Sequence, residues 1–104
     1  RTIKIYNKGE NYRDYVHVSD ITKILSIFVN QNISGIYNIS TGNSFSIKNI
    51  VLFILKKYDS NSKINYVKKI NKLSNFNIFI SNKKIIKKLK NYKFINIKRG
   101  ISYY

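Results

Sequence analysis

The 104-residue sequence predicts a fold of the α/β or α+β class with the element order β-β-α-β-α-β-α. Short segments in which apolar and polar residues alternate predict the strands, and segments with apolar residues three and four positions apart predict the helices. Turn-forming Gly, Asn, Asp and Ser residues separate these segments. No internal repeat and no Gly/Ser-rich linker is present, so we expect a single domain, or a piece of a larger one.

Two strands are predicted at the start of the chain. Residues 2–6 (TIKIY) alternate apolar and polar side chains and end at the turn-like residues 7–11 (NKGEN). Residues 12–18 (YRDYVHV) are rich in Tyr and Val, which favour strands.

A helix is predicted directly after the second strand. Ser19 and Asp20 can cap its first turn, because their side-chain oxygens accept hydrogen bonds from amides that would otherwise have no partner. Its apolar face is predicted to consist of Ile21, Ile24, Leu25 and Phe28, and we expect it to end near residues 30–32.

A second helix follows a short strand and a loop. Residues 35–40 (GIYNIS) predict a buried strand, and Ser46 is the expected N-cap of the helix. Apolar residues then recur at helical spacing as far as Tyr58, so we expect this helix to be well buried. The polar residues 59–62 (DSNS) end it.

The last part of the chain carries weaker patterns. Residues 63–67 (KINYV) alternate as a strand does, and residues 76–80 are a further strand candidate. Residues 82–90 predict a short helix whose inward side chains are Ile85, Ile86 and Leu89. The final fifteen residues carry no clear signal.

The charge of the chain is strongly positive and unevenly distributed. Twenty Lys and Arg residues oppose four Asp and Glu residues, for a net charge of +16, and residues 60–104 hold twelve of the bases and no acid. Such a segment is typical of proteins that bind nucleic acid or an anionic membrane. The alternative is a composition bias, because Lys, Asn and Ile make up half of the chain while Ala and Pro are absent, as an A+T-rich coding sequence would produce.

Composition also limits the cellular setting and the kinds of site. No apolar run approaches the ~20 residues that a membrane span needs, and we expect a cytoplasmic protein. Without cysteine and with a single histidine, the chain offers little material for a transition-metal site. The lack of any methionine suggests a fragment or a processed product.

Residues 9–20 (GENYRDYVHVSD) hold three of the four acids, the only histidine and one of three arginines. In a strand Arg13, Tyr15 and His17 would share one face, where a guanidinium beside a phenol suits a phosphate and an adjacent ring or hydroxyl. The alternative is a surface ion pair of Arg13 with Asp14 or Asp20. We expect His17 to be a half-buried structural residue, Asp20 to act at the helix start, and Asp14 to need a hydrogen-bonding partner if it is buried.

These residues are also the ones that resemble a known family. The stretch IKIYNKGENYRDYVHVSDI, followed after about fifteen residues by GIYNISTGNSFSIKNIV, resembles the C-terminal part of the NAD-dependent epimerase/dehydratase family. These enzymes are extended short-chain dehydrogenases that act on nucleotide sugars, and UDP-galactose 4-epimerase is one of them. The likeness covers residues 2–58, and ISNKKIIKKLKNYKF matches the family's later D-x-S-K helix more loosely.

The resemblance implies a fold, a partner and a set of site residues. It implies the C-terminal, substrate-binding portion of an extended Rossmann-type enzyme, with a nucleotide-diphosphate sugar as ligand and a homodimer in the complete enzyme. Arg13 would bind the diphosphate, Tyr15 would lie beside it, and the strand that holds Lys4 and Tyr6 would help to bind the base. Lys72, or its neighbour Lys69, would replace a second arginine, although no matching acid is present. Neither a membrane nor a nucleic acid is expected as a partner.

The resemblance also shows what the chain lacks. Its four glycines, at positions 9, 35, 42 and 100, do not form the Gly-x-x-Gly-x-x-Gly turn of the family, and none of its nine tyrosines is followed by lysine four residues later. We therefore expect NAD or NADP to be bound by a missing N-terminal half, and this chain alone to have no catalytic residue. The competing hypotheses are a small basic nucleic-acid-binding protein and an inactive truncated product.

Overall fold

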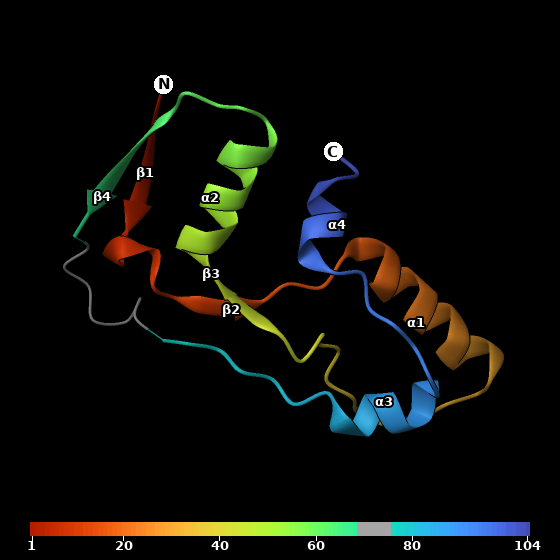
Figure 1. The fold of residues 1–104 in the computed structure, drawn as a ribbon. Helices are drawn as coiled ribbons and strands as arrows, with labels where there is room; N and C mark the ends of the chain where they lie inside the picture. Colours follow the sequence, from red (N-terminus) through yellow and green to blue (C-terminus); the bar gives the residue numbers. More distant parts are fainter. Residues whose placement is uncertain (69–75) are drawn as a thin grey trace. The chain divides into compact units, whose positions relative to one another are not determined.

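The computed structural model describes residues 1–68 and 76–104 and has mixed α/β structure, as predicted (Figure 1). The chain forms two compact units. The first comprises residues 1–13 and 44–79, and the second comprises residues 14–43 and 80–104. Both units are built from segments far apart in the sequence.

The first unit contains a two-stranded parallel sheet. Strand β1 (Thr2–Tyr6) pairs with β4 (Lys63–Val67), with Thr2 opposite Lys63 and Tyr6 opposite Val67. Both strands have the bounds that the alternation predicted. Because the two strands are parallel, the residues that follow them lie at the same edge of the sheet.

A tight turn connects β1 to the rest of this unit. The 3-10 helix η1 (Asn7–Gly9) begins directly after β1, and Gly9 has a φ of +69°, which favours glycine. A Cβ atom at Gly9 would lie 2.8 Å from the backbone nitrogen of Lys48. The missing side chain therefore lets helix α2 (Ile47–Lys57) approach the turn closely.

The second predicted strand is much shorter than expected. Strand β2 covers only Tyr12–Asp14 and pairs with β3 (Ser44–Ser46), so the prediction of a strand over residues 12–18 was wrong beyond Asp14. The strand ends where the Asp14 carboxylate accepts hydrogen bonds from the Thr41 and Gly42 amides, at 3.1 and 2.8 Å, and from the Thr41 hydroxyl at 2.7 Å. The predicted strands at residues 35–40 and 76–80 are not strands in the structure either.

Helix α2 begins as predicted but is not buried. The Ser46 side chain accepts a hydrogen bond from the amide of Asn49 at 3.2 Å, which confirms the predicted N-cap. No residue of α2 is buried, and Leu52 and Ile54 are exposed. The expectation of a buried helix was wrong because a pair of two-stranded sheets offers too little surface to cover its wide apolar face.

The core of the second unit lies between α1 (Val18–Asn30) and α3 (Lys83–Leu89). Ile24, Ile85 and Leu89 are buried, as predicted, and the half-buried Ile86 packs against them. Helix α4 (Ile97–Ile101) follows, in the part of the chain that gave no sequence signal. No helix among the described residues is long and apolar enough to cross a membrane.

Candidate functional site

Arg13 lies on β2 in the first unit and is half-buried. Its guanidinium Nη1 donates hydrogen bonds to the carbonyl of Tyr12, at 2.8 Å, and to the carbonyl of Phe76. No ion pair to Arg13 is formed by the described residues. The alternative of a surface ion pair with Asp14 is therefore not supported, and the positive charge of Arg13 is not neutralised by this part of the chain.

The segment that receives Arg13 runs beside β2. The Ile78 amide donates to the Tyr12 carbonyl at 3.1 Å, and the Tyr12 amide donates to the Asn77 side-chain oxygen at 3.0 Å. The rings of Tyr12 and Phe79 are stacked with their centroids 6.4 Å apart. The candidate strand at residues 76–80 thus fails as a strand, although residues 76–79 do fix the position of β2 and of Arg13.

Two open depressions lie at the carboxyl ends of the parallel strands. The larger has a volume of about 460 Å³ and is lined by residues of η1 and of the end of β4, namely Asn7, Lys8, Glu10, Tyr66, Val67 and Lys68. The smaller is polar and is lined by Asn7, Glu10, Asn11 and Asn77. Ligands of open α/β sheets commonly bind at this edge, and a volume of a few hundred Å³ holds a small ligand.

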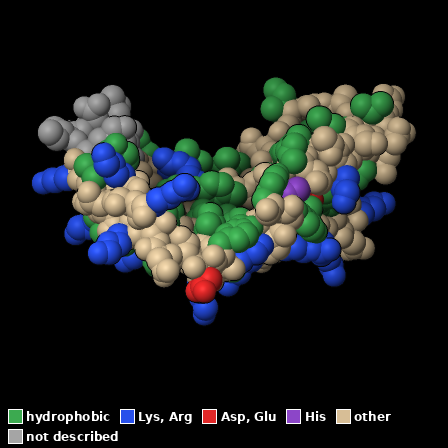
Figure 2. All heavy atoms as spheres, turned by 90° about the horizontal axis from the view of Figure 1, so that it is seen from above, with side chains coloured by type: hydrophobic (Ala, Val, Ile, Leu, Met, Phe, Trp, Pro, Cys, Tyr) green, Lys and Arg blue, Asp and Glu red, His purple; other side chains and the backbone are tan. Residues whose placement is uncertain are grey.

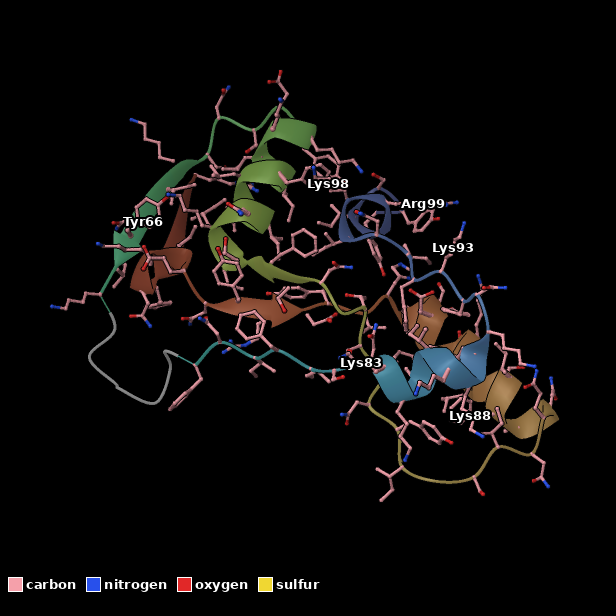
Figure 3. All side chains as sticks on the ribbon, turned by 60° about the horizontal axis from the view of Figure 1, so that its bottom comes forward. Tyr66, Lys83, Lys88, Lys93, Lys98 and Arg99 are labelled. Carbon is pink, nitrogen blue, oxygen red and sulfur yellow. The ribbon has the colours of Figure 1, made fainter. Side chains whose placement is uncertain are left out.

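Sequence reasoning missed the residues that line these depressions. The segment NKGEN was interpreted only as a turn, and Tyr66 and Lys68 were assigned no role. The signal was present, because a parallel strand pair predicts that the residues after each strand share one edge. Figure 3 shows Tyr66 on β4, and the ammonium of Lys48 lies 6.0 Å from the centroid of its ring.

The remaining predicted site residues are distributed as follows. Lys4 and Tyr6 are exposed on β1, which places them in the same unit as Arg13. Tyr15 is half-buried in the second unit. The expected strand face shared by Arg13, Tyr15 and His17 is absent, because β2 ends at Asp14. Lys72 and Lys69 lie outside the described residues.

His17 has a structural role at the start of α1. It is the N-cap residue in place of Ser19 or Asp20, and its Nδ1 accepts a hydrogen bond from the Ser19 amide at 3.2 Å. Nδ1 therefore acts as the hydrogen-bond acceptor that caps the helix. The ring packs edge-on against Tyr103 with centroids 5.5 Å apart.

Asp20 does more than start the helix, and this corrects the sequence-based expectation. Its side chain is 1% exposed and accepts hydrogen bonds from the Tyr92 hydroxyl at 2.7 Å and from the Ile95 amide at 2.9 Å. Burial, together with the hydrogen bond and charge of Asp20, raises the pKa of Tyr92 to about 12. Asp20 thus fixes the C-terminal segment onto α1.

Each unit carries an excess of basic residues. Among described residues the first unit has nine Lys and Arg residues and two acids, Glu10 and Asp59. Figure 2 shows Lys and Arg side chains in several separate patches on the visible surface. In the second unit Lys83 and Lys88 lie on α3 (Figure 3). Lys84 has a structural contact, because its Nζ donates to the Ile36 carbonyl at 2.7 Å.

The described residues hold no cluster of three or more His, Cys, Asp or Glu side chains that could bind a metal. They also lack a glycine-rich turn at a helix N-terminus, the feature that binds the pyrophosphate of a dinucleotide. The residues of this chain therefore do not fit an NAD(P) site of that kind.

Known proteins share both sequence and fold with this chain. No family model matches it. The ADP-L-glycero-D-manno-heptose-6-epimerase of Brachyspira hyodysenteriae is 37% identical over 67 residues, which are 62% of this chain and 21% of that protein. The crystal structure of dTDP-glucose 4,6-dehydratase from Bacillus anthracis, in complex with NAD, matches 99% of this chain with a TM-score of 0.82 and 20% identity. A GDP-D-glycero-L-gluco-heptose synthase from Campylobacter jejuni, solved in the presence of NADPH, matches 97% with a TM-score of 0.74 and 21% identity.

The likeness to the C-terminal part of the NAD-dependent epimerase/dehydratase family is confirmed. The solved members of this family that match the chain include enzymes that hold NAD or NADPH, in agreement with the expected cofactor class. The chain spans about a fifth of the length of the curated relative and about a third of the length of the solved chains. It therefore corresponds to a minor part of these proteins.

Proposed function

We propose that this chain is the substrate-binding part of an NAD(P)-dependent nucleotide-sugar epimerase, dehydratase or reductase, and that it holds the nucleotide diphosphate. The observation that supports the proposal most directly is the hydrogen bonding of the Arg13 guanidinium. Its Nη1 is fixed by two backbone carbonyls, while its Nη2 and Nε make no hydrogen bond to the described residues. The side chain is thus oriented by the protein and keeps N–H donors for a ligand.

A diphosphate matches these donors. Guanidinium forms parallel, charge-assisted hydrogen bonds to phosphate oxygens, and such bonds are about twice as strong as neutral ones. Arg13 does not line the larger depression, which separately has Lys8, Lys68 and Tyr66 in its lining, residue types that suit an anion joined to a ring. The excess of basic residues in the first unit would attract such a ligand from solution.

The proposed contribution to the reaction is positioning. When bound, NAD(P) supplies hydride transfer in enzymes of this kind, and we assign its binding to a part of the enzyme that this chain does not contain. The chain has neither Tyr-x-x-x-Lys nor the glycine-rich turn. We therefore expect it to bind a nucleotide diphosphate without converting a nucleotide sugar. For the complete enzyme we propose a cytoplasmic homodimer.

Calorimetric titration of the chain with UDP, ADP, GDP and dTDP tests the proposal. R13Q is expected to weaken the tightest of these interactions by roughly 10- to 150-fold, because a hydrogen bond to a charged group contributes about 1.5–3 kcal/mol. R99Q on α4 removes the same charge from an exposed position and is the matched control.

Two results would contradict the role of Arg13. One is equal affinity of R13Q and R99Q for the same nucleotide, which would leave only a general attraction by net charge. The other is an affinity that does not change when inorganic diphosphate is added as a competitor. A steep fall of RNA or DNA affinity with salt, shared by all these variants, would instead favour the nucleic-acid hypothesis.

A further inference from the structure

The smaller depression of the first unit differs from the larger one in the chemistry of its lining. It has a volume of about 240 Å³ and is lined by three amide side chains and one acid, namely Asn7, Asn11, Asn77 and Glu10. Pockets that enclose a whole drug-sized ligand have about 300–1,000 Å³, so this depression suits one ring system of a larger molecule. No described Lys or Arg side chain lines it, whereas Lys8 and Lys68 line the larger depression.

Glu10 gives this depression a negative charge in a basic chain. Its carboxylate is exposed and forms no ion pair or hydrogen bond with the described residues. An ionised carboxylate repels phosphate, and it only accepts hydrogen bonds. Its two oxygens accept a parallel pair of hydrogen bonds when two N–H donors lie side by side. The smaller depression therefore suits a group with two adjacent N–H donors and does not suit a phosphate.

Asn77 adds hydrogen-bond donors in a fixed orientation. Its Oδ1 accepts a hydrogen bond from the Tyr12 amide at 3.0 Å. Its Nδ2 carries two N–H groups and donates to none of the described residues. The depression thus offers both an acceptor pair and a donor, which match a ring whose N–H edge lies beside a carbonyl oxygen.

The smaller depression lies next to the Arg13 guanidinium. Nη1 of Arg13 donates to the carbonyl of Phe76, and Asn77 is the following residue. Asn11, on the other segment of the lining, precedes Arg13 by two positions. Residues 76–79 run beside β2, as the hydrogen bond from the Ile78 amide to the Tyr12 carbonyl requires (Figure 1). A nucleotide whose diphosphate lies at Arg13 can therefore place its base in this depression.

We infer that the smaller depression selects guanine as the base of the bound nucleotide, and that Glu10 determines this specificity. Guanine carries N1–H and a 2-amino group side by side for the carboxylate, and its O6 oxygen next to them accepts from Asn77. Adenine offers the carboxylate only its 6-amino group. Uracil and thymine have a carbonyl on each side of their single ring N–H, and these oxygens repel a carboxylate. The inference rests on the proposed function, because it concerns the base of the same ligand.

Calorimetric titration of the chain with GDP, ADP, UDP and inosine diphosphate tests the preference without any variant. Inosine diphosphate lacks only the 2-amino group of GDP. GDP is expected to bind at least about 10-fold more tightly than each of the other three, because each of them loses a hydrogen bond to a charged acceptor. Equal affinities for GDP and inosine diphosphate, or a preference for ADP or UDP, would overturn the inference.

E10Q tests the carboxylate itself. The variant is expected to reduce the ratio of GDP affinity to UDP affinity by roughly 10-fold or more, because the uncharged amide has only one acceptor oxygen. The ratio is compared because loss of a negative charge strengthens the attraction of both anions. D59N removes the same charge from the other described acid of the first unit, which is exposed and lines neither depression, and it should leave the ratio unchanged. Equal ratios in E10Q and D59N would contradict the role of Glu10.

The outcomes for Glu10 and for Arg13 are separable. If R13Q weakens GDP and UDP binding but GDP has no advantage over UDP in the parent chain, the inference about the base is wrong and the proposed function stands. If R13Q and R99Q bind GDP equally while E10Q removes the preference for GDP, the role of Arg13 is wrong and the recognition of guanine stands. Absence of binding by all four nucleotides would refute both. If E10Q lowers the thermal midpoint of the chain, the comparison of GDP with inosine diphosphate in the parent chain decides.

Discussion

Removal of the Tyr92 hydroxyl should destabilise the second unit strongly. That hydroxyl donates to Asp20 Oδ1 at 2.7 Å, and the Ile95 amide donates to Oδ2 at 2.9 Å. The Asp20 side chain is 1% exposed, so water cannot replace a lost donor. Y92F leaves the ring packed beside Phe94, with centroids 5.2 Å apart, and removes only the hydrogen bond.

The size of the effect follows from the charge of the acceptor. A hydrogen bond to an ionised group contributes about 1.5–3 kcal/mol, and a buried carboxylate that loses a donor keeps its desolvation cost. We therefore expect Y92F to lower the free energy of unfolding by about 2 kcal/mol. D20N should cost about 2–4 kcal/mol, because an amide has only one acceptor oxygen and either the Tyr92 hydroxyl or the Ile95 amide loses its acceptor.

Urea unfolding followed by circular dichroism measures both variants. Y103F is the matched control, because it removes a hydroxyl from a tyrosine that is 54% exposed, and it should change stability by less than about 0.5 kcal/mol. The double variant D20N/Y92F should lose less than the sum of the single losses. The reasoning is refuted if Y92F and Y103F unfold at the same urea concentration, or if the two losses add.

Three other changes have defined outcomes. The pKa of Tyr92 is raised to about 12, so the protonated hydroxyl stabilises the folded state fully below pH 10. This stabilisation is lost as the pH rises towards 12. The urea midpoints of wild type and Y92F should therefore converge between pH 10 and pH 12. S46A should cost about 1 kcal/mol through loss of the α2 cap, whereas S62A outside any helix should not. G9A should lower the melting temperature more than G42A, because its Cβ would meet backbone of Lys48 at 2.8 Å, whereas at Gly42 it would meet the movable side chain of Asn82.

Local signals were sufficient to predict helices α1, α2 and α3 and the bounds of strands β1 and β4, whereas α4 was not predicted. The Ser46 cap, the helix within residues 82–90 and the strand at residues 63–67 depend on neighbours within one or two turns, and all three were confirmed. The predictions that were wrong concern residues whose structure depends on contacts with distant parts of the sequence. His17, rather than Ser19 or Asp20, is the N-cap of α1. Asp20 instead accepts hydrogen bonds from Tyr92 and Ile95, which lie more than 70 positions away in the sequence. The spacing of apolar residues in the sequence cannot predict a hydrogen bond between residues so far apart.

Strands were predicted less well because a strand needs a second segment. Residues 35–40 have the right residue types, but they pair with no strand among the described residues. The same reason limited the candidate site. Arg13 was predicted as a site residue from its residue type and from the resemblance, and it stays a prediction. The depression beside Lys8 and Lys68 could not be predicted without knowing that β1 and β4 are parallel neighbours.

The acids of this basic chain explain why its second unit holds together. Asp14 and Asp20 do not neutralise surface lysines, and instead each joins its own segment to a distant one through hydrogen bonds from backbone amides and hydroxyls. A carboxylate in such a position fixes its own segment and the segment whose donors it accepts. An exposed ion pair would add little to the free energy of unfolding. Asp14 and Asp20 are thus used inside the second unit, and the net charge of +16 that the sequence carries attracts an anionic ligand. The same arrangement that stabilises the second unit thus preserves the electrostatic attraction on which the proposed nucleotide site depends.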